Sequence, residues 1–435
     1  MKHFKLIVLM CLVVLMAVTA VACGGTETPG TTATTTPKAD AETTTAATAG
    51  TTAETTAPAT TTVVTTTLPV VTEPVPTSFS SLKIGETPIS DYTIVYAKSP
   101  YEVYARGSGA QYFPVYDFDH ETADRLSDII FGLTGVRLNV VKDTDTTESA
   151  NEILVGATNR TFGGVDVNTL TNDDFVLSIA GGKLAICGGT FGTTWHALDY
   201  LETFFAEKLA ERKADYAFDK NYTYVGSYHL TVIGCIGDSI TQGVGASDQS
   251  MRSYPAQLGR LLWKDAIVKN YGNSGSTMRS DLGDAYTKRA TYSTAVKNAP
   301  KVDIFTIMLG TNDSNRDRDW SDSDTQAYNN SCLNIMKSIK ARNKNVKFVL
   351  ANCPAYFGGD NFGSAKIREI QDALLPIVND AGYPTTFFDM YSVTKTMRAY
   401  YPDSLHPNDM GHLKMAEAFA EYLQTLITPA TEEVK

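Results

Sequence analysis

The sequence has 435 residues, 43% of them hydrophobic and 20% charged, and is long enough for two or three domains with sizeable cores. Its formal net charge of −11 argues against a nucleic-acid partner, because phosphate binding needs clustered Lys and Arg. Beyond residue 22, no apolar run is long enough to cross a membrane as a helix.

The first residues have the pattern of a targeting segment. A basic head at residues 1–5 precedes an apolar stretch at residues 6–18, which is typical of a signal peptide. The following AVACG (residues 20–24) resembles the lipobox of bacterial lipoproteins. That resemblance implies a signal peptide over residues 1–23 and an extracytoplasmic protein, attached to the bacterial cell membrane only through a lipid anchor at Cys23. Ordinary cleavage after an Ala-x-Ala signal, giving a secreted protein, is the alternative.

Residues 24–77 are dominated by Thr, Ala, Pro and Gly and contain few large apolar side chains. Such a segment cannot bury enough apolar surface to offset the loss of chain entropy. We therefore expect a disordered stalk, which would let an anchored enzyme reach across a cell wall.

Four of the six cysteines lie beyond the stalk. None belongs to a CxxC pair or has a histidine at metal-ligand spacing, and the sequence shows no metal site. Buried free thiols are expected, although disulfide bonds remain open, for Cys187, Cys235, Cys332 and Cys353.

Residues 78–228 alternate helix-like and strand-like patterns. Apolar residues recur at helical spacing over residues 120–130 and 193–205. Short apolar runs predict strands at residues 136–141, 152–155, 175–179 and 184–186. Glycine pairs flank GGKLAICGG (residues 181–189), as at hairpin corners.

Two stretches of this region, NEILVGATNR (residues 151–160) and DDFVLSIAGGKLAICGGTFGTTWHALDYLETFF (residues 173–205), carry a resemblance. They are similar to the small α/β domain that precedes the catalytic barrel of family-20 hexosaminidases and family-67 glucuronidases. No barrel follows here, so the resemblance implies an accessory or spacer domain.

Some polar residues of this accessory region could suggest a site of their own. Asp117, Asp119 and His120 stand together, but an aspartate before a helix is usually a cap. His196 lies beside Trp195 on a predicted helix, where we expect a packed interface histidine.

From residue 231 onward, strands and helices alternate regularly. Strands are predicted at residues 232–236, 266–270, 302–309, 346–352 and 385–388. Helices are predicted near residues 254–263, 284–298, 325–342, 365–381 and 407–426. The strands are nearly continuous apolar runs, which favours a parallel sheet covered on both faces. The pattern predicts a three-layer sandwich around a five-stranded, doubly wound parallel sheet, with ligands at the carboxyl ends of its strands.

Four polar blocks follow the predicted strands, namely GDSIT (residues 237–241), NYGNSGST (residues 270–277), GTND (residues 310–313) and DSLHPN (residues 403–408). Their content and order resemble the SGNH/GDSL hydrolase superfamily, and the match covers most of residues 231–427. The resemblance implies the SGNH hydrolase fold for residues 229–429, preceded by a smaller α+β domain over residues 78–228. The first block lacks the second glycine of a Gly-x-Ser-x-Gly elbow, which counts against the α/β-hydrolase fold.

These blocks contain the groups that acyl transfer needs. Ser239 is a poor nucleophile without a base, and His406 is the candidate base, so folding must bring them together. Asp403 can reach its own histidine across a turn and fix the imidazole tautomer, and Pro407 keeps the pair out of the following helix. A turn or helix-entry role for Asp403 is the alternative. The mechanism needs no cofactor.

The resemblance also implies the donors that would stabilise an oxyanion: the backbone N–H of Ser239, the backbone N–H of Gly275 and the side-chain amide of Asn312. Asp238 and Asp313 are interpreted as scaffolding that accepts local backbone N–H groups. His412 lies outside the family's motif and is predicted to be structural or exposed.

Among superfamily members, GDSITQGVGASDQSMRSYPAQLGRLL (residues 237–262) and LHPNDMGHLKMAEAF (residues 405–419) look most like carbohydrate esterases and sialate esterases that remove O-acetyl groups. This implies a surface-anchored serine esterase acting on acylated, foremost O-acetylated, carbohydrate. The alternatives are a lysophospholipase or thioesterase, and a surface protein that binds glycan without turnover. The acyl group, the glycan and the oligomeric state stay open.

Overall fold

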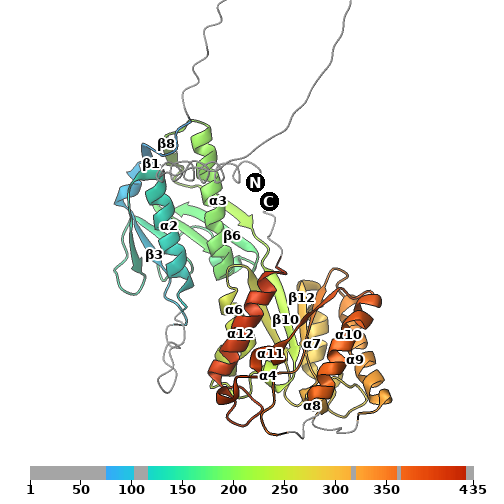
Figure 1. Cartoon of the computed structure of the whole chain (residues 1–435). Coiled ribbons are helices and arrows are strands. Elements are labelled where there is room, and N and C mark those ends of the chain that lie inside the picture. Colours follow the sequence, from blue (N-terminus) through green and yellow to red (C-terminus); the bar gives the residue numbers. More distant parts are fainter. Residues whose placement is uncertain (1–74, 102–115, 315–319, 360–363, 428–435) are drawn as a thin grey trace, which may run out of the picture. The chain divides into compact units, whose positions relative to one another are not determined.

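The computed structural model describes residues 75–101, 116–314, 320–359 and 364–427. These residues form a three-stranded, a six-stranded and a five-stranded sheet (Figure 1). The predicted signal peptide, the Cys23 anchor and nearly all of the predicted stalk lie outside the described residues. Within the described ranges, no helix combines the length and apolar character that crossing a membrane requires.

The six-stranded sheet belongs to the region that precedes residue 228. Its strands lie in the order β4-β3-β5-β7-β6-β9. Their bounds are β3 (Thr93–Tyr96), β4 (Asn139–Lys142), β5 (Glu152–Val155), β6 (Asp174–Ala180), β7 (Lys183–Gly188) and β9 (Thr223–Ser227). β3, β4, β5 and β7 are parallel, whereas β6 is antiparallel to both β7 and β9. The β6–β7 hairpin confirms one predicted corner, at the first glycine pair.

The second glycine pair makes no hairpin, because β7 ends at Gly188 and the chain continues into α3 (Phe191–Ala210). This helix and α2 (Phe118–Thr134) contribute Leu126 and Leu198 to the main core of the region, with β-strand residues such as Ile153. A small sheet in the order β2-β1-β8 adds β1 (Ser81–Ile84), β2 (Thr87–Pro88) and β8 (Asp215–Phe218). The prediction of a smaller α+β domain upstream is confirmed.

The five-stranded sheet is parallel throughout, in the order β11-β10-β12-β13-β14. Its strands are β10 (Thr231–Gly237), β11 (Ala266–Gly272), β12 (Ile304–Met308), β13 (Lys347–Ala351) and β14 (Thr385–Phe388). The chain enters the sheet at β10, next to the edge strand β11, and continues on its other side with β12, β13 and β14, so the order reverses beside β10. The predicted doubly wound sheet is confirmed.

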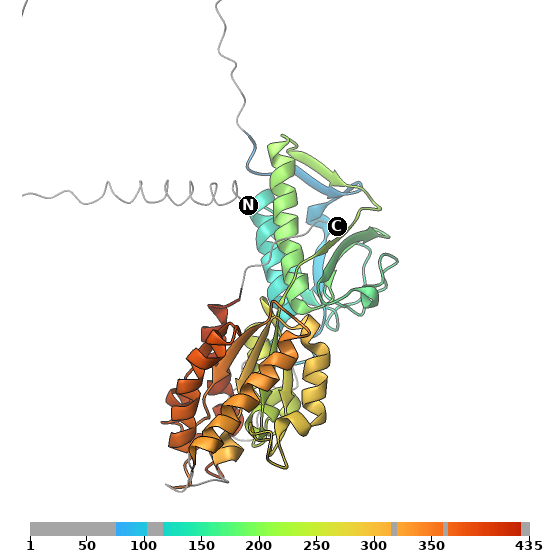
Figure 2. The same cartoon turned by 90° about the vertical axis from the view of Figure 1, so that its right-hand side faces the viewer.

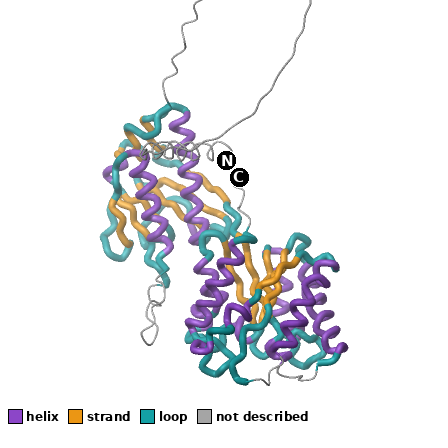
Figure 3. The backbone as a smooth tube through the Cα atoms, in the orientation of Figure 1, coloured by secondary structure: helices purple, strands orange, loops and turns teal. Residues whose placement is uncertain are grey.

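Helices cover both faces of this sheet (Figures 1 and 2), and Figure 3 shows its strands between them. Along β12, Phe305 and Ile307 point into a core shared with α7, α9 and α10, while Ile304 and Met308 point into another shared with α6 and α12. The long helices are α6 (Tyr254–Leu261), α7 (Ala290–Asn298), α9 (Asp322–Lys340), α10 (Ser364–Asp380) and α12 (Asp409–Gln424). The short ones are α4 (Ser239–Gln242), α5 (Gln249–Arg252), α8 (Thr311–Ser314) and α11 (Met390–Thr394).

Three helix starts in this half of the chain differ from the prediction by two residues or more, and one of them is α9, which begins at Asp322 and not near residue 325. The helix expected from residue 284 begins only at Ala290, because Tyr286 donates its backbone N–H to the carbonyl of Thr277 and is held in a separate 3-10 turn. The last helix begins at Asp409, where Asn408 caps it by accepting from the backbone N–H of Gly411. Buried free thiols are confirmed for all four described cysteines.

Candidate active site

The turn after β10 displays Ser239 at the carboxyl edge of the sheet. Asp238 is the N-cap of α4, and its carboxylate accepts from the backbone N–H of Ile240 at 3.0 Å. Ser239 is the first residue of that helix and is 5% exposed. A turn this tight requires glycine at position 237, because a Cβ there would lie 1.9 Å from the Thr241 hydroxyl oxygen. The scaffolding role predicted for Asp238 is confirmed.

A second turn, between the 3-10 helix Arg398–Tyr400 and α12, holds the Asp403–His406 pair. One carboxylate oxygen of Asp403 accepts from the backbone N–H of Leu405 at 2.9 Å and of His406 at 2.6 Å. The other lies 2.7 Å from Nδ1 of His406. Ser404, between them, has a φ of 71°, a left-handed conformation that is uncommon for a residue with a side chain.

The fold brings these two turns together. Nε2 of His406 lies 2.9 Å from Oγ of Ser239, across 167 residues of sequence. Partial burial of Asp403 acts to raise its pKa, but the hydrogen bonds from His406 and Leu405 prevail and lower it. An ionised carboxylate can only accept, so Nδ1 carries the proton and the Nε2 lone pair faces the serine hydroxyl.

Besides Ser239, the residues predicted to bind an oxyanion are Gly275, in the loop after β11, and Asn312, in the helix after β12. Gly275 has a φ of 74°, in the left-handed region that favours glycine. Asn312, on α8, donates one hydrogen of its side-chain amide to the carbonyl of Ser276 at 2.9 Å. This hydrogen bond connects α8 to the loop that contains Gly275. Among the described residues, none accepts from the backbone N–H of Ser239 or Gly275.

Asp313 differs from its prediction, because its partners are not local. Its carboxylate accepts from the backbone N–H groups of Met278 at 2.8 Å and Arg279 at 3.0 Å, 35 and 34 residues away. Burial raises the pKa of Asp313 to about 6, against the effect of these hydrogen bonds. Asp313 therefore fixes the loop that carries Gly275.

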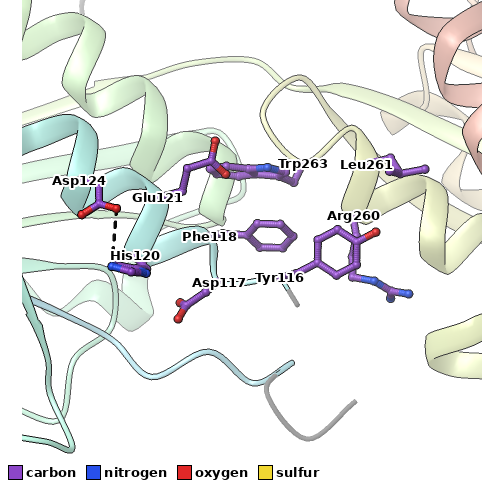
Figure 4. A pocket seen from close by; sticks show the side chains of 9 residues that line it. All are labelled: Tyr116, Asp117, Phe118, His120, Glu121, Asp124, Arg260, Leu261 and Trp263. Atoms are coloured by element: carbon purple, nitrogen blue, oxygen red, sulfur yellow. Dashed lines mark ion pairs between the residues drawn. The ribbon is translucent and has the colours of Figure 1, made fainter. Parts of the chain in front are cut away.

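The polar residues of the accessory region lie around α2. Asp117 occupies the N-cap position of α2 without a side-chain capping bond, so the predicted cap is wrong. Asp119 is buried, and burial raises its pKa to about 8. His120 pairs with Asp124 at 3.6 Å (Figure 4).

An open hollow of about 420 Å³ lies beside these residues. Figure 4 shows the side chains that line it. The rings of Phe118 and Trp263 stack within it at 4.6 Å. Its lining comprises Tyr116, Asp117, Phe118, His120, Glu121, Asp124, Arg260, Leu261 and Trp263. Ser239, Asp403 and His406 are not part of this lining, so the hollow is separate from the candidate active site.

Two other histidines are packed. His196 is 9% exposed and bonds to Asp199 and to the carbonyl of Lys264, which confirms the predicted interface role. His412 is fully buried on α12, the structural one of its two predicted outcomes.

Asp409, which sequence reasoning missed, accepts from the backbone N–H of Ser247, 162 residues away. No spacing along the chain marks a contact of that separation.

A serine hydroxyl against an imidazole whose other nitrogen is held by a carboxylate is the arrangement of serine hydrolases. Here it stands at the carboxyl edge of a doubly wound parallel sheet, where such folds bind ligands. Residues 235–414 match the model of the GDSL-like Lipase/Acylhydrolase family.

One curated relative is the acetylxylan esterase of Xylanibacter ruminicola, 27% identical over 209 residues. The alignment covers 43% of this chain, which spans only 42% of that relative's length.

Solved structures with a similar fold include an aryl esterase of M. smegmatis, which is 20% identical in sequence. The match covers 45% of this chain and 100% of the other chain, with a TM-score of 0.36. A carbohydrate acetylesterase from Sinorhizobium meliloti has 16% identity over 45% and 99% of the two chains, with a TM-score of 0.34. A family two carbohydrate esterase from Clostridium thermocellum has 20% identity over 45% and 64%, with a TM-score of 0.34.

Proposed function

We propose that this protein is a serine esterase that removes O-acetyl groups from polysaccharide through an acetyl-enzyme. The observation that carries the proposal is the continuous hydrogen-bonded line from Ser239 Oγ through His406 to Asp403, with contacts of 2.9 and 2.7 Å. The first distance lies within the range that proton transfer between a nucleophile and its base requires, and the second is a hydrogen bond that orients the base.

In the proposed acylation step, Ser239 Oγ attacks the carbonyl carbon of the acetyl ester and its proton passes to Nε2 of His406. Asp403 stabilises the imidazolium that forms, since its carboxylate holds the Nδ1 proton. The tetrahedral intermediate then collapses, the C–O bond to the sugar breaks, and His406 returns its proton to the departing sugar oxygen. A free sugar hydroxyl and an acetylated Ser239 result.

The oxyanion of that intermediate would be bound by the backbone N–H groups of Ser239 and Gly275 and by the amide of Asn312. Support comes from the second hydrogen on the Asn312 amide nitrogen, which the bond to Ser276 leaves available. Neutral donors of this kind favour the transition state without binding a neutral substrate strongly.

In deacylation, His406 takes a proton from water, and the resulting nucleophile attacks the acetyl carbon. The second tetrahedral intermediate expels Ser239 Oγ, which recovers its proton from Nε2 of His406. The acetyl group leaves as acetic acid, which ionises to acetate by releasing its remaining proton to bulk water, and the resting state is restored.

Carbohydrate as the substrate class is supported by the name of the curated relative, an acetylxylan esterase. The position of the base is consistent with a polymeric substrate, since the His406 and Asp403 side chains are 17% and 55% exposed. A polysaccharide chain can approach such a surface site without entering a closed cavity.

A comparison of substrates tests the proposal. Purified protein should release acetate from acetylated xylan, and a fluorophosphonate probe should label Ser239. Ser239→Ala should abolish both, whereas acetate release by Ser239→Ala would refute the mechanism. Fatty-acid release from lysophospholipid, with acetylated xylan untouched, would assign a lipid substrate. A folded protein that binds xylan but neither reacts with the probe nor turns over would be a glycan-binding protein.

We also propose that Cys23 anchors the mature protein to the outer side of the cell membrane, as its AVACG context suggests. The full-length protein expressed in a bacterium should partition into detergent, and Cys23→Ala should shift it to the aqueous or secreted fraction. Partition that is the same for both forms would refute the anchor.

A further inference from the structure

His412 is the second histidine near the base, and it is held at both ring nitrogens. Nδ1 accepts from the backbone N–H of Tyr254 at 3.3 Å, and Nε2 lies 3.2 Å from the carbonyl oxygen of Val244. Because an N–H only donates and a carbonyl only accepts, these partners select the neutral ring with its proton on Nε2. Burial lowers the pKa of His412 to about 4, which keeps this form at neutral pH.

Val244 links that ring to the predicted nucleophile. The backbone N–H of Val244 donates to the carbonyl of Ser239 at 2.9 Å, while its own carbonyl faces His412. Val244 is therefore bonded on one side to Ser239 and on the other side to α12. Helix α12 begins three residues after His406, so this bridge joins the two turns of the candidate site.

Two neighbouring contacts strengthen the same junction. A Cβ at Gly245 would lie 2.3 Å from the carbonyl oxygen of Pro407 and 3.1 Å from Cβ of His406, so the two turns touch. The Asp409 carboxylate accepts from the backbone N–H of Ser247 at 2.7 Å and from its hydroxyl at 2.6 Å.

We propose that His412, assisted by Asp409, is a positioning residue for ester hydrolysis: it ties α12 to the turn that follows Ser239 and so sets the contact between Ser239 and His406. The inference rests on the proposed roles of Ser239 and His406. Neither residue touches the substrate. Proton transfer is sensitive to displacements well below the width of an atom, so a loosened junction slows the chemical step without weakening substrate binding.

The two bonds of His412 can be separated by substitution. In His412→Gln the amide nitrogen reaches about as far as Nε2 and can still donate to Val244. In His412→Asn the amide oxygen reaches about as far as Nδ1, and only the bond from Tyr254 survives. His196→Gln is a matched control, since His196 is also buried and held at both ring nitrogens, but in the accessory region.

We expect His412→Asn to lower kcat by about 10–100-fold with KM unchanged, and to slow fluorophosphonate labelling of Ser239 by the same factor. His412→Gln should recover most of that loss, although both variants unfold more easily than the parent. His196→Gln should lose stability and keep kcat. Equal kcat in the parent, His412→Asn and His412→Gln would overturn the proposal, as would a fall in kcat that simply follows the folded fraction.

Two surface variants keep the proposal testable if His412→Asn does not fold. Asp409→Ala and Ser247→Ala should each lower kcat, Asp409→Ala more because it removes both contacts with Ser247, and unchanged kcat in both would overturn it. A failure of the proposed function is recognised separately. In that case the parent protein itself leaves Ser239 unlabelled, or Ser239→Ala stays active.

Discussion

The proposed oxyanion donor Asn312 gives the sharpest test of the candidate site. Asn312→Ala removes a side-chain amide whose second hydrogen the bond to Ser276 leaves available for the proposed oxyanion. Loss of one such donor lowers kcat by about 10²–10³-fold, equivalent to about 3–4 kcal/mol of transition-state stabilisation. KM should change little, because the donor acts on charge that develops only after attack.

The same substitution has a structural cost that must be separated from catalysis. The Asn312 amide donates to the carbonyl of Ser276, a residue with no exposed surface. Leaving that carbonyl without its donor should lower the free energy of unfolding by about 1–3 kcal/mol. A domain stable by about 5–15 kcal/mol stays almost fully folded after such a loss. Instability of this size cannot therefore produce a hundredfold fall in kcat.

Asn343→Ala is the matched control. Its amide donates to the carbonyls of Ala299 at 3.2 Å and Val302 at 2.9 Å, at the amino end of the same sheet. Hydrolysis of p-nitrophenyl acetate and urea denaturation should show both variants destabilised and only Asn312→Ala inactive. If both lose kcat alike, or if Asn312→Ala keeps kcat within about threefold, Asn312 is not an oxyanion donor.

The turn that holds the base gives further expectations. Asp403→Asn presents an amide to Nδ1 and favours the wrong tautomer of His406, so kcat should fall by about 10²–10⁴-fold with KM unchanged, and full activity would exclude Asp403 from the mechanism. Ser404→Val should lower the free energy of unfolding by about 1–2 kcal/mol, because a β-branched residue resists the left-handed φ, while Ser404→Gly should leave it nearly unchanged. Denaturation curves that coincide for the two variants would contradict that strain. Folding lowers the pKa of His412 from 6.5 to about 4. Between these values the unfolded state binds a proton that the native state does not, so native stability declines as pH drops from 6.5 towards 4. The stability difference between the parent and His412→Asn should shrink over that range by at most about 3 kcal/mol, and a constant difference would refute the assigned burial.

The sheet of the C-terminal half could be predicted because its central strands β10, β12 and β13 are apolar runs that are almost entirely buried. The edge strands β11 and β14 contain exposed residues, but the observed bounds of all five strands lie close to those expected. Once the sheet is parallel, the blocks after its strands must share one edge. This topology explains why Ser239 and His406 could be paired from the sequence across 167 residues.

The accessory region was harder to predict because the strands at the edges of its sheets are short and half exposed. Strand β8 alternates exposed and partly buried residues over only four positions, and it pairs with β1 far back in the chain. Neither periodicity nor turn residues reveal such a pairing. The same limit applies to side chains, since nothing near Asp313 in sequence indicates that it accepts from Met278 and Arg279.

Three aspartates around the candidate site show how their surroundings divide their roles. Asp403 is half exposed, and its hydrogen bonds keep it ionised, as a partner of His406 must be. Burial instead raises the pKa values of Asp238 and Asp313 to about 6. Between pH 3.8 and about 6 the native state binds protons that the unfolded state has released, so stability from these two groups declines as pH rises.

The loss of stability that follows from the raised pKa of Asp313 has a structural reason. Its two oxygens each accept a hydrogen bond from one backbone N–H of the loop that carries Gly275. An asparagine would offer one acceptor oxygen, and its amide N–H would face the second backbone N–H, donor against donor. Only a carboxyl group holds that loop at both points. Rigid placement of the loop that carries the proposed oxyanion donor is therefore obtained with a buried acid that lowers stability at neutral pH.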